Sequence, residues 1–404
     1  MNTSRSSVPA AASDHRAALV ATYLGWTLDA FDFFLVSLCL TAIGREFHKS
    51  DAQVAASLLL TLAFRPVGAF FFGLLADRYG RRLPLMLVLV FYSVIEVLSG
   101  LAPNYTTFLV LRALFGIGMG GEWGVGASLA MEKVPARLRG VLSGFLQQGY
   151  ATGNLLASIC FFLIFPRFGW RPLFFLGGLP ALLAVFVQFR VKESEVWQKT
   201  GHQSWGNLGR AILSQWKLFL YLAVFMMTMN LASHGTQDLY PTFLERQWHF
   251  DVGHRAVLNG VSMLGAVIGG TLIGLFSDWW GRRRAIVAAF LGAVLVIPLW
   301  IFAPSLPLLF AGAFLMQFLV QGAWGVIPAH LAELSPDSVR GFLPGFGYQV
   351  GVLLASPVVY LEPLIARHTS YGITMAGTAA VVFLMAALAA GLGTERRAVT
   401  FGEG

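Results

Sequence analysis

The sequence predicts an all-α membrane protein with twelve transmembrane helices, arranged as two six-helix bundles related by a repeat in the same orientation. Composition, regularly spaced apolar runs and an internal repeat carry this prediction. Hydrophobic residues make up 56% of the 404 residues and charged residues only 12%, about half of the ~25% that soluble domains carry. A soluble fold of this length, a disordered chain and a secreted disulfide scaffold are therefore poor fits.

A helix that crosses a bilayer needs about 20 mostly apolar residues, and charged residues or Pro/Gly clusters separate twelve such runs. In chain order we expect spans at 17–40, 52–76, 83–102, 106–131, 140–164, 170–189, 215–240, 253–276, 285–303, 306–331, 341–366 and 371–393. The polar residues 1–16 lack the apolar core of a secretory signal and are expected to form a flexible N-terminal tail. Residues 394–404 are expected to form the C-terminal tail.

The 28 Lys and Arg residues indicate the topology of these spans. With the N-terminus inside, the cytoplasmic segments hold 19 of them: Arg5, Arg16, Arg78, Arg81, Arg82, Lys133, Arg137, Arg139, Arg190, Lys192, Lys199, Arg210, Lys217, Arg282, Arg283, Arg284, Arg340, Arg396 and Arg397. The outer loops hold 7: Arg45, Lys49, Arg167, Arg171, Arg246, Arg255 and Arg367. This bias predicts cytoplasmic termini in a plasma membrane, such as a bacterial inner membrane. It also accounts for the net charge of +8 without a nucleic-acid partner.

The sequence repeats itself at an offset of 201 residues without a gap. The stretch 73–82, GLLADRYGRR, falls on 274–283, GLFSDWWGRR, and Arg139-Gly140 falls on Arg340-Gly341. We therefore expect bundles at 17–190 and 215–393, joined by a cytoplasmic linker at 191–214. In such parallel-repeat transporters the substrate site lies near the membrane midplane between the halves.

These repeated residues resemble signatures of the major facilitator superfamily, as does Arg112-x-x-x-Gly116-x-Gly118 in the fourth expected span. The resemblance covers essentially the whole chain and implies alternating access by two rocking bundles. In the loop motif, Asp77 and Asp278 can accept hydrogen bonds from a neighbouring helix N-terminus. We expect these two residues to act in a conformational gate; the alternative is that the motif only anchors the topology.

Charged side chains inside the spans are few. A charge at the bilayer centre costs about 2.5–3.5 kcal/mol, so such residues usually mark a pathway. Asp29 and Asp32 lie three residues apart on one face of the first span, and Arg65 lies near the middle of the second. Glu122 follows a glycine-rich run in the fourth span, Arg112 lies near the outer end of the same span, and Glu96 lies in the third.

The seventh span has the richest set of polar residues. They recur at steps of three and four and so form one helical stripe, made of Asn230, Ser233, His234, Gln237 and Asp238. In lipid such a stripe must face protein or a water-filled cavity. At the 201-residue offset, Asn230 and Ser233 coincide with Asp29 and Asp32, which predicts polar faces at one height in both halves.

The stripe, read as Asn-x-x-Ser-His-x-Thr-Gln-Asp-x-x-x-Thr, resembles the signature of lactate/pyruvate:proton symporters within the sialate:proton symporter family. Carried over by position, the resemblance implies a substrate-binding set of Arg65, Asn230, Ser233, His234, Gln237 and Gln349. Buried acids and histidines can exchange protons near neutral pH when burial and neighbouring charges shift their pKa values. The candidate proton-coupling set is therefore Asp29, Asp32, Glu122, His234 and Asp238. The central loop is minimal compared with fungal members, so their loop-based regulation is not inferred.

Most of these residues also have a structural interpretation. Arg65 could merely neutralise Asp29 or Asp32, and these two carboxyl groups could instead pair with Arg65 or Arg112. His234 could be a hydrogen-bonded packing residue, and Asp238 could cap or gate its helix. Glu122 could be a structural partner within its bundle.

The leading functional hypothesis is proton-coupled symport of a small monocarboxylate, such as L-lactate or pyruvate. Arg65 supplies a permanently charged fork that matches a carboxylate. Proton symport of sialic acid or of an aromatic acid such as benzoate is the alternative. A membrane-embedded enzyme using His234 and Asp238 would need a nucleophile and metal-ligand cluster, which the sequence lacks. We expect no cofactor, no bound metal, no nucleic acid and a functional monomer whose partners are an organic anion, protons and lipid.

Overall fold

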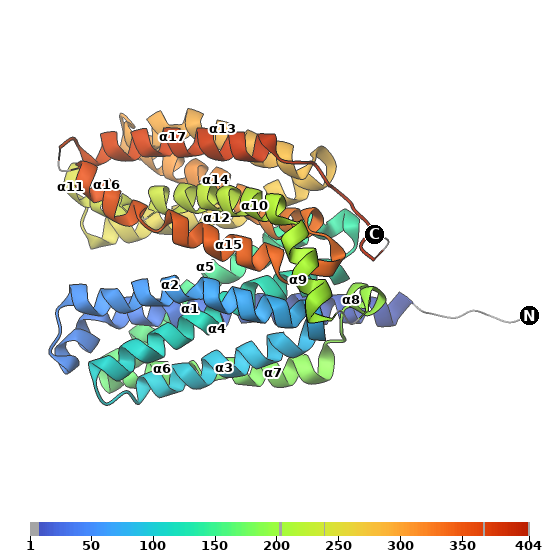
Figure 1. Ribbon diagram of the computed structural model, residues 1–404. Coiled ribbons are helices and arrows are strands. Elements are labelled where there is room, and N and C mark those ends of the chain that lie inside the picture. Colours follow the sequence, from blue (N-terminus) through green and yellow to red (C-terminus); the bar gives the residue numbers. More distant parts are fainter. Residues whose placement is uncertain (1–7, 202–203, 238, 367, 403–404) are drawn as a thin grey trace, which may run out of the picture.

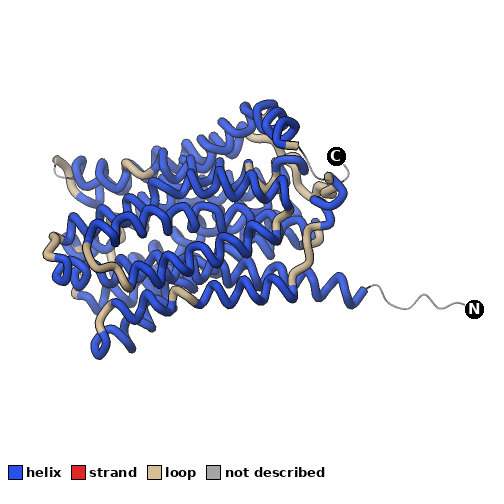
Figure 2. Tube along the Cα trace, turned by 60° about the horizontal axis from the view of Figure 1, so that its bottom comes forward, coloured by secondary structure: helices blue, strands red, loops and turns tan. Residues whose placement is uncertain are grey.

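The computed structural model describes residues 8–201, 204–237, 239–366 and 368–402. Throughout this part of the chain the regular structure is helical and contains no strand, as the tube in Figure 2 shows. The predicted all-α class is confirmed.

The first half of the chain forms one group of helices (Figure 1). It consists of α1 (Val8–Phe47), α2 (Asp51–Tyr79), α3 (Arg82–Gly100), α4 (Tyr105–Lys133), the short 3₁₀ helix η1 (Ala136–Leu138), α5 (Arg139–Phe168), α6 (Arg171–Leu176) and α7 (Leu179–Arg190). Most of its buried hydrophobic residues form a cluster of their own, while Trp26, Trp123 and Ala127 belong to the cluster of the second half.

The second half forms a matching group beside the first (Figure 1). It consists of α10 (Trp216–Gln237), α11 (Tyr240–Gln247), α12 (Val252–Trp280), α13 (Arg282–Ile301), α14 (Leu306–Leu334), the 3₁₀ helix η2 (Asp337–Val339), α15 (Leu343–Ala355), α16 (Val358–Ala366) and α17 (Tyr371–Leu392). Two short linker helices, α8 (Glu195–Thr200) and α9 (Trp205–Ser214), connect the groups. They lie at the end of the molecule where the chain also begins and finishes (Figure 1), which we call the termini end.

Eleven helical stretches of the described chain are long and apolar enough to cross a membrane. The predicted span 341–366 is the exception, because a turn at Ser356 and Pro357 divides it into α15 and α16. Proline lacks a backbone N–H and cannot continue the hydrogen-bonding of a helix. Gly177 and Gly178 divide the predicted span 170–189 in the same way into α6 and α7.

Two other predicted boundaries were wrong. The described part of the predicted flexible tail 1–16 is helical, because α1 begins at Val8, within an alanine-rich stretch that has high helix propensity. The seventh span was expected to end at 240, but after α10, which is described as far as Gln237, α11 continues the helical path from Tyr240 to Gln247.

Candidate substrate site and gate

Arg65 lies on α2 at the interface between the two halves. Its side chain is buried, with 4% of the residue exposed, and its guanidinium carbon lies 5.8 Å from the ring centre of Tyr348 on α15. Its Nε and Nη2 atoms have no hydrogen-bond partner among the described residues. The side chain therefore holds hydrogen-bond donors that the protein itself does not use.

An aromatic cluster surrounds this contact. The ring of Trp123 on α4 lies 4.5 Å from that of Tyr348, and the ring of Trp324 on α14 lies 5.8 Å from it at a steep angle. Trp26 on α1 packs at 6.5 Å against Trp123. Side chains of both halves thus build the apolar wall beside Arg65, and Tyr348 is a residue that the sequence analysis did not single out.

A cluster of acids fills the interior of the first half. Asp29 and Asp32 on α1, Glu96 on α3 and Glu122 on α4 are all fully buried. Both carboxyl oxygens of Asp29, Asp32 and Glu122 lack a hydrogen-bond partner in the described structure. Arg112 forms its ion pair with Glu96. In the described structure, neither Asp29 nor Asp32 therefore forms a hydrogen-bonded pair with Arg65 or Arg112, which was the structural alternative.

The acids of this cluster do not all face the interface between the halves. A Cβ atom added to Gly177, at the break between α6 and α7, would lie 2.7 Å from Asp32 Oδ1, so Asp32 points into the first bundle. Tyr92 on α3 lies within electrostatic range of all four carboxyl groups, and its hydroxyl group has no hydrogen-bond partner in the described part of the chain. Tyr92 was not predicted as a site residue, although it lies four residues from Glu96 and so on the same helical face.

The polar stripe of the seventh span lies on the last turns of α10 and contacts α14. Gln321 donates a hydrogen bond of 3.1 Å to Ser233 Oγ, and Gln237 donates one of 3.0 Å to Gln317 Oε1. The side-chain amide of Asn230 donates back to the carbonyl oxygen of Met226. These three bonds all stay within the second half. Gln317 and Gln321 were not predicted, although their spacing places them on one face of α14.

The predicted site also includes Gln349, His234 and Asp238. Gln349 on α15 is fully buried, and neither of its side-chain atoms has a partner in the described structure. His234 is half-buried on α10, and Asp238 lies outside the described residues. The sequence analysis missed Glu362, a buried acid on α16 that accepts a 2.7 Å hydrogen bond from the Thr378 hydroxyl group.

The two loop aspartates connect the halves at the termini end. Asp77 accepts hydrogen bonds from the backbone nitrogens of Gly341, at 2.7 Å, and Phe342, at 2.9 Å, directly before α15. Asp278 accepts the equivalent bonds from Gly140, at 2.8 Å, and Val141, at 3.0 Å, in the first turn of α5. Each aspartate therefore holds the start of a helix in the opposite half, where the helix dipole favours a negative charge.

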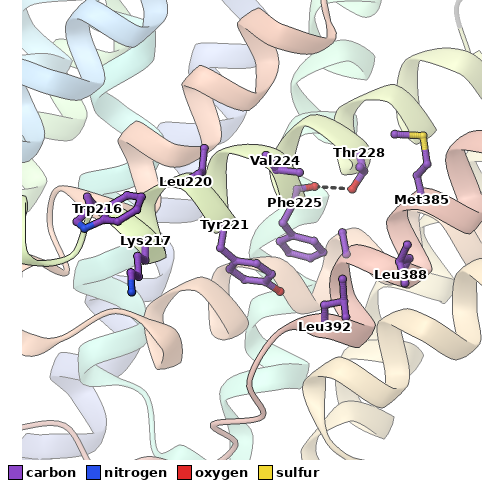
Figure 3. A pocket seen from close by; sticks show the side chains of 11 residues that line it. Trp216, Lys217, Leu220, Tyr221, Val224, Phe225, Thr228, Met385, Leu388 and Leu392 are labelled. Atoms are coloured by element: carbon purple, nitrogen blue, oxygen red, sulfur yellow. Dashed lines mark hydrogen bonds between the residues drawn. The ribbon is translucent and has the colours of Figure 1, made fainter.

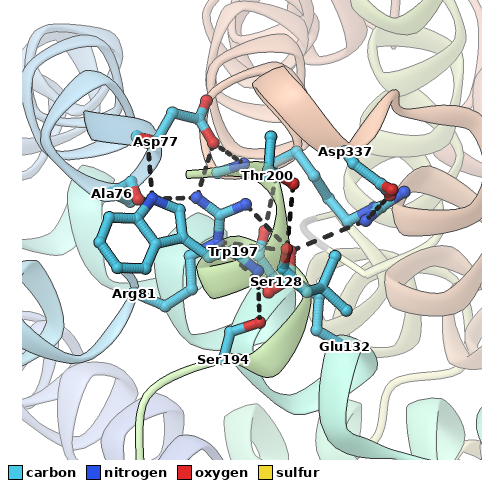
Figure 4. A network of polar contacts seen from close by, with 12 residues as sticks. Ala76, Asp77, Arg81, Ser128, Glu132, Ser194, Trp197, Thr200 and Asp337 are labelled. Carbon is cyan, nitrogen blue, oxygen red and sulfur yellow. Dashed lines mark hydrogen bonds and ion pairs between the residues drawn. The ribbon is translucent and has the colours of Figure 1, made fainter. Parts of the chain in front are cut away.

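A buried network supports Asp77 (Figure 4). Arg81 donates to Asp77 Oδ1 at 2.7 Å and pairs with Glu132 on α4 at 3.0 Å. Burial alone would lower the pKa of the Arg81 guanidinium, but Glu132 and Asp77 beside it raise that pKa above its ordinary value. The Trp197 indole of linker helix α8 donates to the backbone oxygen of Asp77 at 2.8 Å, so the linker takes part in the same network.

The segment that follows α17 also bridges the halves. The ring of Phe401 lies between two guanidinium groups, 3.8 Å from that of Arg139 in the first half and 3.7 Å from that of Arg340 in the second. Arg139 donates to the carbonyl oxygen of Val399 at 3.0 Å and to Glu333 of the second half at 3.1 Å. This contact was not predicted, because the short polar tail has no sequence pattern that indicates a binding partner.

The two halves and the bonds between them define a helical membrane transporter. The chain belongs to the family of sugar (and other) transporters, whose model matches residues 17–215 and 220–394, within the major facilitator superfamily. The solved structure of the proton:xylose symporter XylE, bound to 6-bromo-6-deoxy-D-glucose, matches with a TM-score of 0.79 at 18% identity, over 97% of this chain and 98% of that one. The major facilitator fold is confirmed.

Two curated relatives are similar over most of this chain. A carboxylic acid transporter protein homolog of Saccharomyces cerevisiae is 29% identical over 372 residues, which are 85% of this chain and 60% of that protein. The chain thus matches only part of the length of that relative. The sialic acid transporter NanX of Escherichia coli is 30% identical over 376 residues, 89% of each chain.

Proposed function

We propose that the protein is a proton-coupled symporter of small monocarboxylates, such as L-lactate or pyruvate, in the inner membrane of a bacterium with both termini in the cytoplasm. The observation that carries this proposal is the buried Arg65, whose Nε and Nη2 atoms have no partner in the described structure. A guanidinium group offers a planar pair of donors that matches a carboxylate. Two curated relatives whose names refer to acids support the same substrate class.

Charge balance in the first half supports proton coupling. Four buried carboxyl groups, Asp29, Asp32, Glu96 and Glu122, share this interior with two buried guanidinium groups, Arg65 and Arg112. Complete ionisation would leave two negative charges of this cluster uncompensated, and buried unpaired charges are costly. Protons taken up with the substrate anion would remove that excess. Asp29 and Glu122 both lie within electrostatic range of Arg65, so these two acids are placed to respond to a bound anion.

The bonds at the termini end support alternating access. Asp77, Asp278, Arg139 and the Phe401 ring all join the two halves there. Because Arg65 is buried, a substrate must reach it through a rearrangement of the halves. Opening the termini end would break these bonds, so we assign them the role of a gate whose closure keeps the site from the cytoplasm.

Uptake into liposomes tests the proposal. Purified protein is reconstituted, an inside-alkaline pH gradient is imposed, and labelled L-lactate is offered with competing mono-, di- and keto-acids. We expect accumulation that a protonophore abolishes and that small monocarboxylates inhibit best. Accumulation that follows a sodium gradient and ignores pH would contradict proton coupling.

The second candidate is proton symport of sialic acid or of an aromatic acid such as benzoate. Two observations favour it: the 30% sequence identity to a sialic acid transporter and the aromatic wall beside Arg65. The same competition experiment separates the candidates, because strong inhibition by benzoate or sialic acid and none by lactate would select the second.

A further inference from the structure

One groove of the described structure lies away from Arg65, on the outer surface of the second half. It has a volume of about 540 Å³ and runs between α10 and α17. Leu220, Val224, Leu388 and Leu392 are among the side chains that line it (Figure 3). All four are substantially exposed, so in a membrane this groove faces lipid, and an acyl chain fits its apolar lining.

One end of the groove is polar and cationic. Lys217, in the first turn of α10, lines the groove, and its side chain is exposed. The hydroxyl group of Tyr221 has no hydrogen-bond partner in the described part of the chain. Arg283 is close by, because it donates at 3.0 Å to the carbonyl oxygen of Gly393, the residue that packs against the Tyr221 hydroxyl group.

These groups lie where a lipid headgroup would be. Trp216 and Lys217 start α10 directly after the linker, at the termini end (Figure 1), and Leu392 ends α17 at the same end. Tryptophan and cationic side chains are typical of the level at which the hydrocarbon of a bilayer meets its headgroups. The apolar lining of the groove therefore extends from this level toward the middle of the membrane.

We propose that the groove is a binding site for one anionic phospholipid of the leaflet at the termini end. An acyl chain fills the space between α10 and α17, and Lys217 contacts the phosphate. Arg283 adds a second positive charge near the headgroup. Basic residues at a membrane surface attract anionic lipids, whereas an apolar lining alone would accept any acyl chain.

A second groove of the same half offers an internal comparison. It has a volume of about 320 Å³ and is lined by apolar residues of α12 and α14: Leu272, Ile273, Leu275, Phe276, Trp279 and Phe318. No cationic side chain lines it. It should therefore hold lipid without preference for the headgroup, and any preference of the protein for anionic lipid should depend on the groove beside Lys217.

Native mass spectrometry of the purified full chain tests this site. Phosphatidylglycerol and phosphatidylcholine with the same acyl chains are titrated separately into the detergent-solubilised protein. We expect phosphatidylglycerol to bind at a lower lipid concentration than phosphatidylcholine. Each contributing cation should lower the required concentration by about fivefold. Lys217→Gln should remove about fivefold of that preference, and Lys217→Gln with Arg283→Gln should remove more. Arg137→Gln changes an exposed cation at the same end of the molecule and should leave the preference unchanged.

Two further variants locate the bound lipid. Val224→Trp fills the proposed groove, while Leu272→Trp fills the comparison groove. We expect the first variant to lose preferential retention of phosphatidylglycerol and the second to keep it. Equal retention of the two lipids by the unmodified protein, an unchanged preference in Lys217→Gln, or loss of preference in Leu272→Trp alone would overturn the proposal. The readout is binding of lipid, so it does not depend on which acid the protein transports.

Discussion

Asp77 Oδ1 lies 2.7 Å from the backbone nitrogen of Gly341, across the interface between the two halves. The repeat places Asp278 at 2.8 Å from the backbone nitrogen of Gly140. Each half therefore carries an acid that binds the start of a helix in the other half. Because the two contacts are reciprocal, both must break when the termini end opens.

Replacing Asp77 by Asn should shift the protein toward a state that is open at the termini end. A hydrogen bond to a charged group contributes about 1.5–3 kcal/mol, so losing the charge should change the ratio of closed to open protein by at least roughly tenfold. Spin labels at the exposed Arg137 and Arg284, in a Cys160→Ser background, report the separation of the halves. Asp278→Asn should give the same shift, because its contacts are equivalent. Distances unchanged in both variants would show that the motif only anchors the topology.

Gly341→Ala should prevent closure of the gate for a steric reason. A Cβ atom at this position would lie 2.7 Å from Asp77 Oδ1 and 2.9 Å from Arg81 Nη1, closer than nonbonded atoms approach. We expect lower uptake and a larger distance between the same two labels. Gly377→Ala is the matched control, because an added Cβ there meets nothing within 4 Å. Equal behaviour of the two variants would contradict the tight contact at Gly341.

Phe401→Ala should weaken closure of the gate without removing it. The ring contacts the guanidinium groups of Arg139 and Arg340, and a cation–π contact contributes about 0.5–2 kcal/mol. The same label pair should report a partial shift toward the open state, smaller than that of Asp77→Asn. Thr400→Ala changes the exposed neighbouring residue and should have no effect. If the distribution of distances between the two labels in Phe401→Ala is identical to that in the unmodified protein, the tail has no role in closure.

Asp29→Asn should uncouple transport from protons. The carboxyl group is buried without a hydrogen-bond partner in the described structure, so its amide replacement removes a charge and breaks no bond seen here. Exchange of labelled acid across the membrane should continue, whereas accumulation driven by a pH gradient should be lost. Glu46→Gln serves as a control, since Glu46 pairs with Arg171 near the surface at 2.6 Å. Gradient-driven accumulation that survives in Asp29→Asn would assign the coupling to another acid.

The sequence predicted the features that depend on local spacing. The repeat identified Asp77 and Asp278 together, and each accepts backbone hydrogen bonds from the start of a helix in the other half. The spacing of apolar residues predicted the helices. This spacing could not predict the breaks at Gly177 and Pro357. The run of apolar residues continues across both positions, whereas the helix is interrupted there.

Contacts between distant segments were the part that could not be predicted. The stripe on α10 was recognised from its helical period, but its partner Gln317 lies 80 residues further along the chain. The orientation of Asp32 depends on how α6 and α7 pack near Gly177. Phe401 meets two arginines only because the folded halves bring their helix starts together. No local sequence pattern predicts such contacts between distant segments.

Binding of the acid to purified Arg65 variants tests the central claim most directly. Arg65 lies on α2, and the repeat places Ala266 at the equivalent position of the second half, so the charge is not part of the shared scaffold. Losing a two-donor contact with a charged carboxylate should cost about 2–3 kcal/mol. We predict that Arg65→Ala binds labelled lactate at least roughly thirtyfold more weakly while its thermal unfolding still shows a folded protein. Arg65→Lys should recover little, because an ammonium group cannot form the paired contact. Binding by Arg65→Ala with the affinity of the unmodified protein would contradict the assignment of Arg65 as the substrate-binding cation.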